Sequence, residues 1–445
     1  MERSNTFQIV IIGIFVALVI LGFLAFSGHL PLPTGSQDVN YGTVTLWGTL
    51  PKAAVDKVIG DNLSTDTHIK ITYVEKSQAT FNSDFIEALA SGNGPDLILL
   101  SQDNILRNLD KISLIPYTTL SERDFMNTFL PEAQMFLQPQ GIAAMPITID
   151  PIVMYWNRDI FSNALVVTPP SLWTQFYDLV PKITVHDSSG NITQSLVSFG
   201  EYRNVSNAKE IVSLLLMQAG SPIVLNQNGS LSADLVVAGS AGAQDPVTSA
   251  LRFFTEFSKP DQAAYSWNRA LPLSRTMFES GNLAIYFGYA SEYQSIMAKN
   301  PHLNFDVALV PQATQTGQTP GQSLTKLTFG RVEGAAIVKA SKNQQGALYA
   351  AMALSGKNVV ADMSTTLGLP PVRSDLITTP PQDPVQTIFY NSAIISRGWY
   401  DPSPDDTDAL FTSMFDGLSS GNTLLSNAIA TAQTGLGKLL EPYRK

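Results

Sequence analysis

The chain begins with one long apolar segment. Residues 7–26 read FQIVIIGIFVALVILGFLAF, with Gln8 as the only polar side chain. A helix rises 1.5 Å per residue, so a segment of this length spans about 30 Å of hydrocarbon. We therefore expect residues 1–27 to form an N-terminal transmembrane helix that anchors the protein through residues 7–26. Residues 28–42, which contain proline and glycine, are expected to form a linker.

A cleaved signal peptide is the alternative interpretation of this segment. Ala25 and Ser27 are small residues at a possible cleavage site. The apolar part of a signal peptide, however, has only about 7–15 residues and follows a positively charged start, whereas Glu2 offsets Arg3 here. Both interpretations place the rest of the chain outside the cytoplasm, either anchored at the outer face of the cell membrane or secreted.

From residue 43 the pattern changes to an alternation of strands and helices. Residues 43–50 and 68–76 alternate apolar and polar side chains, which is typical of strands. Between Phe81 and Leu89 the apolar residues recur at helical spacing, and the apolar run DLILL follows at 96–100. This succession predicts an α/β fold with a parallel sheet that helices cover on both faces.

The alternation continues to the C-terminus. Residues 141–161 contain two apolar runs joined through 148–150, and residues 329–341 have the pattern of a strand pair. Helical periodicity predicts helices within residues 169–183, 207–220, 245–259 and 423–440. The repeated crossings favour two α/β lobes, although a barrel also fits the pattern.

Composition excludes several classes of partner and chemistry. Hydrophobic residues make up 44% and charged residues 14% of the 445 positions, which is typical of a folded globular body. The formal net charge is −10, and the chain has no cationic stripe for nucleic acid. It contains no cysteine, which excludes disulfides, cysteine zinc sites, thiol catalysis and a lipidated cysteine.

No catalytic or cofactor-binding motif is complete. The four histidines are far apart, and no HExxH, GxSxG or full P-loop pattern occurs. We expect no enzymatic activity, no cofactor and no metal. A glycan-active enzyme would need two carboxylates about 5–9.5 Å apart across a cleft. The candidates for such a pair are Asp103, Asp150, Glu201 and Glu333.

The segment DPSPDDTD at residues 401–408 is a cluster of carboxylates. It has acids at the first and fifth positions of a calcium-binding loop, but Asp406 stands where glycine is needed and Thr412 where glutamate is needed. A solvated loop in which Asp406 or Thr407 caps the next helix is the simpler interpretation. A weak calcium site is the alternative.

Aromatic residues recur near the ends of predicted strands. They are Trp47, Tyr155, Trp156, Trp267, Tyr289, Trp399 and Tyr400. In open α/β sheets ligands bind outside the carboxyl ends of the strands. A flat ring at that place can stack on the apolar face of a sugar while polar neighbours bond to its hydroxyls. Packing in the core is the alternative role of each ring.

An ordered set of segments resembles a known family. SGNGPDLILL, GIAAMPITIDPIVMYWNRDIF, PPSLWTQF, FESGNLAIYFG, NPHLNFDVALVPQ, EGAAIVKASKNQQGALYAAMAL and LGLPPVRSDL occur in the same order as in the extracellular solute-binding proteins of family 1. This is the maltose-binding-like group that serves ABC importers. The resemblance extends from Thr43 to the end of the chain.

The resemblance implies a two-lobed periplasmic-binding-protein-like fold of type II, which closes on its ligand by hinge motion. It places crossovers between the lobes near residues 148–150, 288–291 and 340–343. The expected ranges are 43–148 plus 290–341 for lobe 1, and 149–289 plus 342–445 for lobe 2.

The resemblance also implies a set of ligand contacts, to which we add Trp399 from the aromatic residues. The expected set is Trp47, Ser101, Gln102, Asp103, Thr148, Asp150, Tyr155, Glu201, Asn204, Trp267, Asn268, Tyr289, Arg331, Glu333 and Trp399. The chain departs from the family where many members have a stacking tryptophan, because Ala290 occupies that position. It also lacks the usual lipid-anchoring cysteine, which favours the helical anchor.

We therefore expect a monomeric solute receptor that binds a mono- or oligosaccharide and delivers it to ABC permease subunits. A ligand-sensing subunit for a membrane signalling partner is the alternative, followed by an extracellular glycan-active enzyme.

Overall fold

The computed structural model of the protein describes residues 40–443, apart from residues 228, 236–244, 314–325 and 380. The expected transmembrane helix at residues 7–26 and most of the expected linker lie outside the described residues. Within the described part of the chain, no helix is long and apolar enough to cross a membrane.

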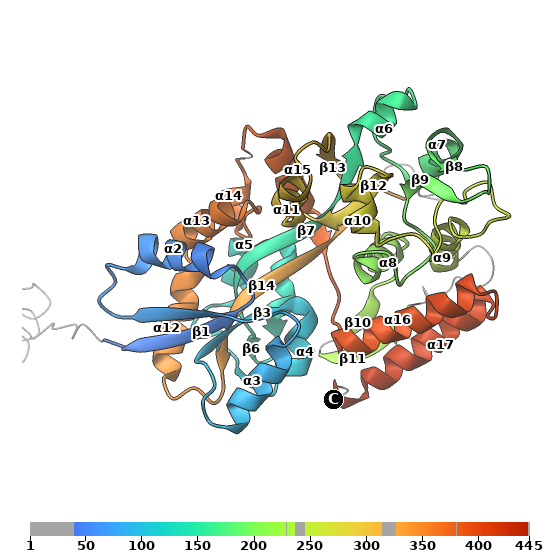
Figure 1. The fold of residues 1–445 in the computed structure, drawn as a ribbon. Helices are drawn as coiled ribbons and strands as arrows, with labels where there is room; N and C mark the ends of the chain where they lie inside the picture. The colour runs from blue at the N-terminus through green and yellow to red at the C-terminus, as the bar shows by residue number, and fades with distance from the viewer. Residues whose placement is uncertain (1–39, 228, 236–244, 314–325, 380, 444–445) are drawn as a thin grey trace, which may run out of the picture.

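Most strands belong to one mixed sheet that runs through both halves of the molecule (Figure 1). Its main path has the order β2–β1–β3–β14–β7–β12–β9–β8. The first three strands are parallel, as predicted, but β14 is antiparallel to both β3 and β7. The strands are β1 (Thr43–Gly48), β2 (Lys70–Glu75), β3 (Leu97–Ser101), β4 (Ile112–Ser113), β5 (Leu137–Gln138), β6 (Gly141–Ile142), β7 (Met145–Asn157), β8 (Val185–His186), β9 (Ile192–Val197), β10 (Ile223–Gln227), β11 (Ser230–Asp234), β12 (Leu283–Tyr289), β13 (Phe305–Ala308), β14 (Thr328–Val338) and β15 (Ser396–Arg397).

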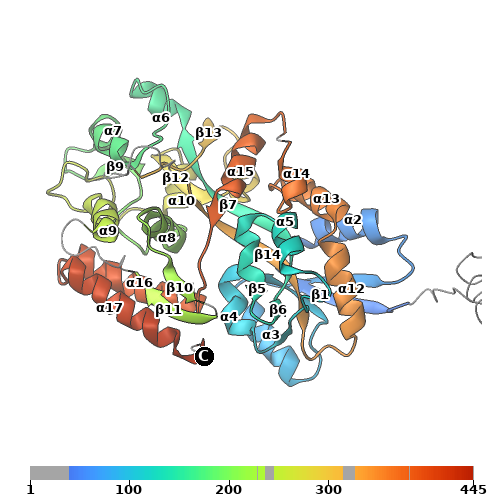
Figure 2. The same ribbon diagram turned by 180° about the vertical axis from the view of Figure 1, so that it is seen from behind.

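Helices pack around this sheet, and α16 and α17 lie side by side at one edge of the molecule (Figure 2). The α-helices are α2 (Lys52–Leu63), α3 (Phe81–Ala90), α4 (Ile105–Asn108), α5 (Glu122–Thr128), α6 (Arg158–Asn163), α7 (Phe176–Ile183), α8 (Ala208–Gln218), α9 (Pro246–Glu256), α10 (Ser274–Glu279), α11 (Glu292–Lys299), α12 (Gln344–Leu354), α13 (Lys357–Leu367), α14 (Ser374–Ile377), α15 (Pro384–Ile394), α16 (Pro404–Ser419) and α17 (Leu425–Leu439). The 3-10 helices are η1 (Gln102–Asn104), η2 (Pro131–Phe136), η3 (Trp173–Gln175) and η4 (Glu441–Tyr443).

Two hydrophobic cores divide the molecule. The first is built from residues between 44 and 149 together with residues between 332 and 393. The second is built mainly from residues between 152 and 329 together with residues between 399 and 440. We call the parts of the chain around these cores the first lobe and the second lobe (Figure 1).

The two long strands β7 and β14 pass from one core to the other. In β7, Ile149 belongs to the first core and Ile152 to the second; in β14, Phe329 belongs to the second core and Val332 to the first. The sequence pattern indicated two apolar runs joined through residues 148–150 in the first segment and predicted a strand pair in the second, whereas β7 and β14 are each one continuous strand. The polar interruption does not end either strand, because the two strands pair antiparallel across it.

The expected crossover at residues 148–150 coincides with the passage of β7 between the cores. The chain does not cross near 288–291, because Ile296 of the following helix α11 stays in the second core. Nor does it cross near 340–343, because Ala347 of α12 packs in the same core as Val338. The second passage lies inside β14, and α15 contributes to both cores, with Phe389 in the second and Ala393 in the first.

Core membership therefore differs from the expected lobe ranges. Residues 290–313 and 326–329 were expected in lobe 1, yet their buried apolar side chains pack in the second core. Residues 344–367 of α12 and α13 were expected in lobe 2, yet they pack in the first core, apart from Leu367, which contacts both. The difference arises because the chain returns to the first lobe through β14 instead of through the end of β12.

Candidate functional site

One face of the ribbon formed by β7 and β14 carries expected ligand-binding residues. Arg331 pairs with Asp150, and Glu333 pairs with Thr148. Residues directly opposite each other on antiparallel strands share a face, and so do residues two apart on one strand. The four side chains therefore lie on the same face of the ribbon where it passes between the lobes.

Arg331 joins this face to the end of β12 and the first turn of α8. Its Nη2 donates a hydrogen bond to Tyr289 Oη at 2.9 Å, and Tyr289 Oη donates to Glu210 Oε1 at 3.3 Å. The guanidinium carbon of Arg331 lies 4.3 Å from the centroid of the Tyr289 ring. Tyr289 was expected to face a ligand, but it is only 5% exposed and Arg331 covers one face of its ring.

Asp150 ties β7 to the segment that follows β12. Its Oδ1 accepts a hydrogen bond from the backbone N–H of Ser291 at 3.0 Å. Burial raises the pKa of Asp150 to about 6, although the bonds from Ser291 and the charge of Arg331 act to lower it. Asp150 therefore contributes to the charge of the site and to the connection between the lobes.

Gln102 is buried where η1 of the first lobe meets β14. Its Nε2 donates to the carbonyl oxygen of Gly330 at 3.0 Å, and its Oε1 accepts the N–H of Val332 at 2.6 Å. Both ends of the amide are thus bonded to the backbone of β14. In this arrangement Gln102 positions the strand that carries Arg331.

A small pocket of about 70 Å³ lies between the carboxyl ends of β1 and β3 and the passage of β14. Four expected residues line it: Ser101, Asp103, Arg331 and Glu333. Burial raises the pKa of Glu333 to about 7; Arg331 opposes this rise, whereas Asp103 and Asp150 add to it. The fold therefore brings together carboxylates from separate parts of the sequence.

Thr148 and Tyr155 are buried in β7. The hydroxyl of Tyr155 donates to the carbonyl oxygen of Tyr289 at 2.7 Å. The ring of Tyr155 is fully buried and packs 6.0 Å from the ring of Tyr286, and Thr148 is 5% exposed. The hydroxyl of Tyr155 thus connects β7 to the end of β12, and both residues offer little surface to a ligand in this conformation.

The expected contacts from the second lobe form a separate hydrogen-bonded group. Asn204 accepts a bond from Trp267 Nε1 at 3.1 Å and donates to the carbonyl oxygen of Asn268 at 2.9 Å. Trp267 is fully buried, and Glu201 forms an ion pair with Arg269 at 3.0 Å. These bonds fix the segment that leads into α10.

The two remaining expected tryptophans differ in exposure. Trp47 at the end of β1 is partly exposed, and Lys76 Nζ lies 3.9 Å from the centroid of its ring. Trp399 is buried, and its Nε1 donates to Ser213 Oγ of α8 at 3.0 Å. Trp47 therefore remains partly accessible, whereas Trp399 packs in the second core.

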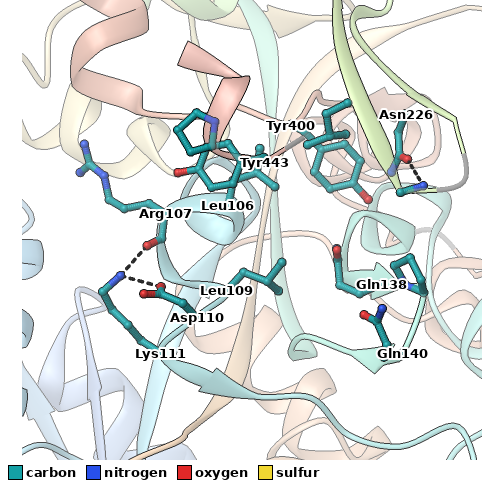
Figure 3. Close-up of a pocket in the computed structure, with 14 residues that line it drawn as sticks. Leu106, Arg107, Leu109, Asp110, Lys111, Gln138, Gln140, Asn226, Tyr400 and Tyr443 are labelled. Carbon is teal, nitrogen blue, oxygen red and sulfur yellow. Dashed lines mark hydrogen bonds and ion pairs between the residues drawn. The ribbon is translucent and has the colours of Figure 1, made fainter. Parts of the chain in front are cut away.

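A larger pocket of about 540 Å³, which we call the interlobe pocket, was not predicted (Figure 3). The first lobe contributes residues 106, 107 and 109–111 around α4 and residues 138–140 around β5 and β6. The second lobe contributes Asn226 near the end of β10, together with Tyr400 and Tyr443. Tyr400 is the one aromatic residue from the predicted strand ends that lines this pocket. The other lining residues come from segments that are distant in the sequence, so the sequence pattern did not indicate the pocket.

Charged residues bridge the lobes near the interlobe pocket. Arg107 Nη2 donates to Asp405 Oδ2 at 2.8 Å and to Ser403 Oγ at 3.0 Å. Arg107 belongs to the first lobe, and the other two stand at the start of α16 in the second. The described arrangement therefore has its lobes in direct contact on this side.

The carboxylates of the acidic segment 401–408 bond to other residues of the protein. Asp401 is buried, pairs with Lys209 at 2.9 Å and accepts the hydroxyl of Thr407. The N-cap of α16 is Ser403, where Asp406 or Thr407 was expected. Within the described residues, no group of three histidine or carboxylate side chains is placed to hold a metal ion.

Comparisons with known proteins agree with this architecture. Residues 59–387 match the family model described as bacterial extracellular solute-binding protein. No curated protein matches the chain.

Three solved structures illustrate the likeness in fold. The cyclic α-maltosyl-1,6-maltose-binding protein of Arthrobacter globiformis has a TM-score of 0.72 and 14% identity, with 90% of this chain and 99% of that chain covered. An ABC transporter solute-binding protein from Thermotoga lettingae, bound with α-D-tagatose, has a TM-score of 0.64 and 19% identity over 90% and 100%. A substrate-binding protein from Listeria monocytogenes, in complex with cycloalternan, has a TM-score of 0.66 and 15% identity over 89% and 98%.

Proposed function

Because the chain belongs to the bacterial extracellular solute-binding proteins, we propose that it is a receptor that binds a carbohydrate between its lobes and delivers it to an ABC importer. The family and the structural neighbours are binding proteins, not enzymes. Membership of an extracellular family also implies an extracytoplasmic location.

The main support for this proposal is that β7 and β14 pass between two separately packed cores. A change in the angle between the lobes needs to alter only the few residues at these passages, so each core can move as a unit. A ligand that contacts both lobes would stabilise one such angle. This is the behaviour expected of a binding protein that signals occupancy by closure.

The residues that line the interlobe pocket and the ligands of the structural neighbours both support a carbohydrate as the ligand. Tyr400 and Tyr443 supply rings, while Gln138, Gln140 and Asn226 supply amide groups (Figure 3). Rings and amides together suit the apolar faces and the hydroxyls of a sugar. The neighbours' structures were determined with α-D-tagatose and cycloalternan, or are named for a maltose derivative.

We further propose that residues 7–26 hold the receptor at the membrane as a monomer, beside the permease subunits that receive the ligand. Support comes from the length of this apolar segment and from the absence of a cysteine for a lipid anchor.

Calorimetric titration of the full chain in detergent with a panel of mono- and oligosaccharides tests the proposal. We expect saturable binding of at least one sugar. Tyr400→Ala should weaken binding by roughly 1–3 kcal/mol if the ring stacks on the ligand, whereas Tyr177→Ala, at an exposed tyrosine of the second lobe, should leave affinity unchanged. Binding of peptides or polyamines without binding of any sugar would refute the carbohydrate assignment.

A further inference from the structure

Residues 394–400, which we call the 394–400 connection, lead from α15 into the second lobe and pack closely against β14. Ala393 before the connection belongs to the first core, and Trp399 near its end belongs to the second. Within it, β15 pairs with β14, and a Cβ added at Gly330 would lie only 2.6 Å from Ser396 Cβ. Ordinary carbon contacts measure about 3.5–4.0 Å. The connection and β14 therefore fit together without spare room where both pass between the lobes.

The 3-10 helix η2 of the first lobe contacts the 394–400 connection at two alternate residues. A Cβ added at Gly398 would lie 2.5 Å from Glu132 Oε1. Two residues later, Tyr400 Oη donates a hydrogen bond to the carbonyl oxygen of Met135 at 3.1 Å. Trp399, between them, packs in the second core. The first lobe thus holds the connection at residues 398 and 400, and the second lobe holds it at residue 399.

Glu132 is a buried acid at this contact. It is 1% exposed, and its Oε1 has no hydrogen-bond partner. Burial raises the pKa of Glu132 to about 8, although the charge of Arg397 and a hydrogen bond from the backbone N–H of Gly398 act to lower it. A buried polar atom without a partner costs stability. Such a cost beside a connection between lobes suggests a role in function, since proteins depart from ideal packing mainly at functional sites.

We propose that Glu132 is a positioning residue for ligand binding, which acts through Gly398 to set where Tyr400 stands in the interlobe pocket. Tyr400 lines that pocket (Figure 3) and lies two residues beyond the contact between Gly398 and Glu132. A binding group must be held to within about 0.5 Å by the residues behind it, so a displaced Gly398 would misplace the ring. The inference rests on the proposed function, because Tyr400 is taken to contact the sugar.

Calorimetric titration of the full chain in detergent with maltotriose, mannotriose and D-tagatose tests the inference. Gly398→Ala should weaken binding about tenfold, because the new Cβ overpacks the contact with Glu132. Glu132→Ala removes that obstacle, so the double variant should bind no more weakly than Glu132→Ala alone. Non-additivity of this kind measures the coupling between the two positions. In a Tyr400→Ala background, Gly398→Ala should have no further effect on affinity.

Two control variants separate positioning from stability. Glu132→Gln keeps the size and the uncharged state of the side chain and should keep affinity within twofold. Gly356→Ala crowds another glycine of the first lobe, where an added Cβ would lie 2.9 Å from Ala353 O, and should keep affinity even if the melting temperature falls. If Gly398→Ala does not fold, Glu132→Ala alone should weaken binding about fivefold through loss of the bond from the Gly398 N–H.

Hydrogen exchange of the ligand-free chain, measured by mass spectrometry, supplies a readout that needs no sugar. Glu132→Ala and Gly398→Ala should speed exchange in the peptide that covers residues 396–400 several-fold, whereas Glu132→Gln should not. If the parent binds a sugar and Gly398→Ala binds it equally well, the positioning role fails and the receptor function stands. If no sugar binds but exchange responds as expected, the positioning of the connection stands and the carbohydrate function fails. Unchanged exchange in both variants overturns the inference.

Discussion

Replacing Tyr289 by alanine is predicted to destabilise the protein more than it weakens ligand binding. Tyr289 is only 5% exposed, and loss of a buried aromatic side chain costs about 3–5 kcal/mol. Arg331, 4.3 Å from the ring centroid, would also lose a cation–π contact, worth about 0.5–2 kcal/mol. A loss near 4 kcal/mol predicts a fall in melting temperature on the order of 10 °C, since 1 kcal/mol shifts a lobe of this size by roughly 2–4 °C.

Differential scanning calorimetry of the ligand-free protein measures this fall, and Tyr289→Phe is the matched control. Phenylalanine keeps the ring beneath Arg331 and removes only the hydroxyl that bonds to Arg331 and Glu210. The control should lose about 1–3 kcal/mol, because both partners are charged. A melting temperature of Tyr289→Ala within 2 °C of the parent, combined with a tenfold loss of sugar affinity, would show that the ring contacts the ligand and would refute this reasoning.

Three further substitutions test the connections around the site. Arg107→Ala should weaken ligand binding two- to fivefold by calorimetry, because the ion pair between Arg107 and exposed Asp405 joins the lobes. Such exposed pairs contribute about 0.2–1 kcal/mol. The control Arg203→Ala breaks an ion pair within the second lobe and should leave affinity unchanged. Burial raises the pKa of Glu132 from 4.5 to about 8, so the native state binds the extra proton and stability should fall as pH rises from 4.5 to 8. Denaturant titrations should show a weaker fall in Glu132→Gln, and an identical pH profile would contradict this assignment. Asn157→Ala should cost about 0.5–2 kcal/mol in the same titrations, because Asn157 Oδ1 caps α6 with bonds to two backbone N–H groups.

Local periodicity was sufficient to predict much of the α/β pattern. The expected helices at 207–220 and 245–259 appear as α8 and α9, because each has an apolar face that packs in the second core. The helix expected at 169–183 is shorter: α7 begins only at Phe176, after the 3-10 turn η3. Pairing across the sheet could not be derived from periodicity, so the segment of β7 was described as two joined apolar runs and the segment of β14 as a strand pair.

The fold brings three of the expected polar residues to one pocket, whereas several of the expected aromatic rings are buried in a core. Asp103, Arg331 and Glu333 come from distant segments and line the small pocket. Tyr155 and Trp267, by contrast, are fully buried. A strand end can direct a ring towards the core or towards a cleft with the same sequence pattern, so periodicity does not distinguish the two. The interlobe pocket was missed for a related reason, since its walls meet only in the folded chain.

The polar residues that interrupt the pattern of β7 and β14 are explained by where these strands cross. Midway between the two cores, Asp150, Arg331 and Glu333 on this ribbon face are only partly buried, and none of them belongs to either core. Val332, on the opposite face between them, packs in the first core. The polarity that interrupts the apolar pattern therefore coincides with the passage between the cores, and it supplies the charges that line the small pocket. We therefore expect a ligand that contacts Arg331 or Glu333 to act also on the strand that connects the lobes.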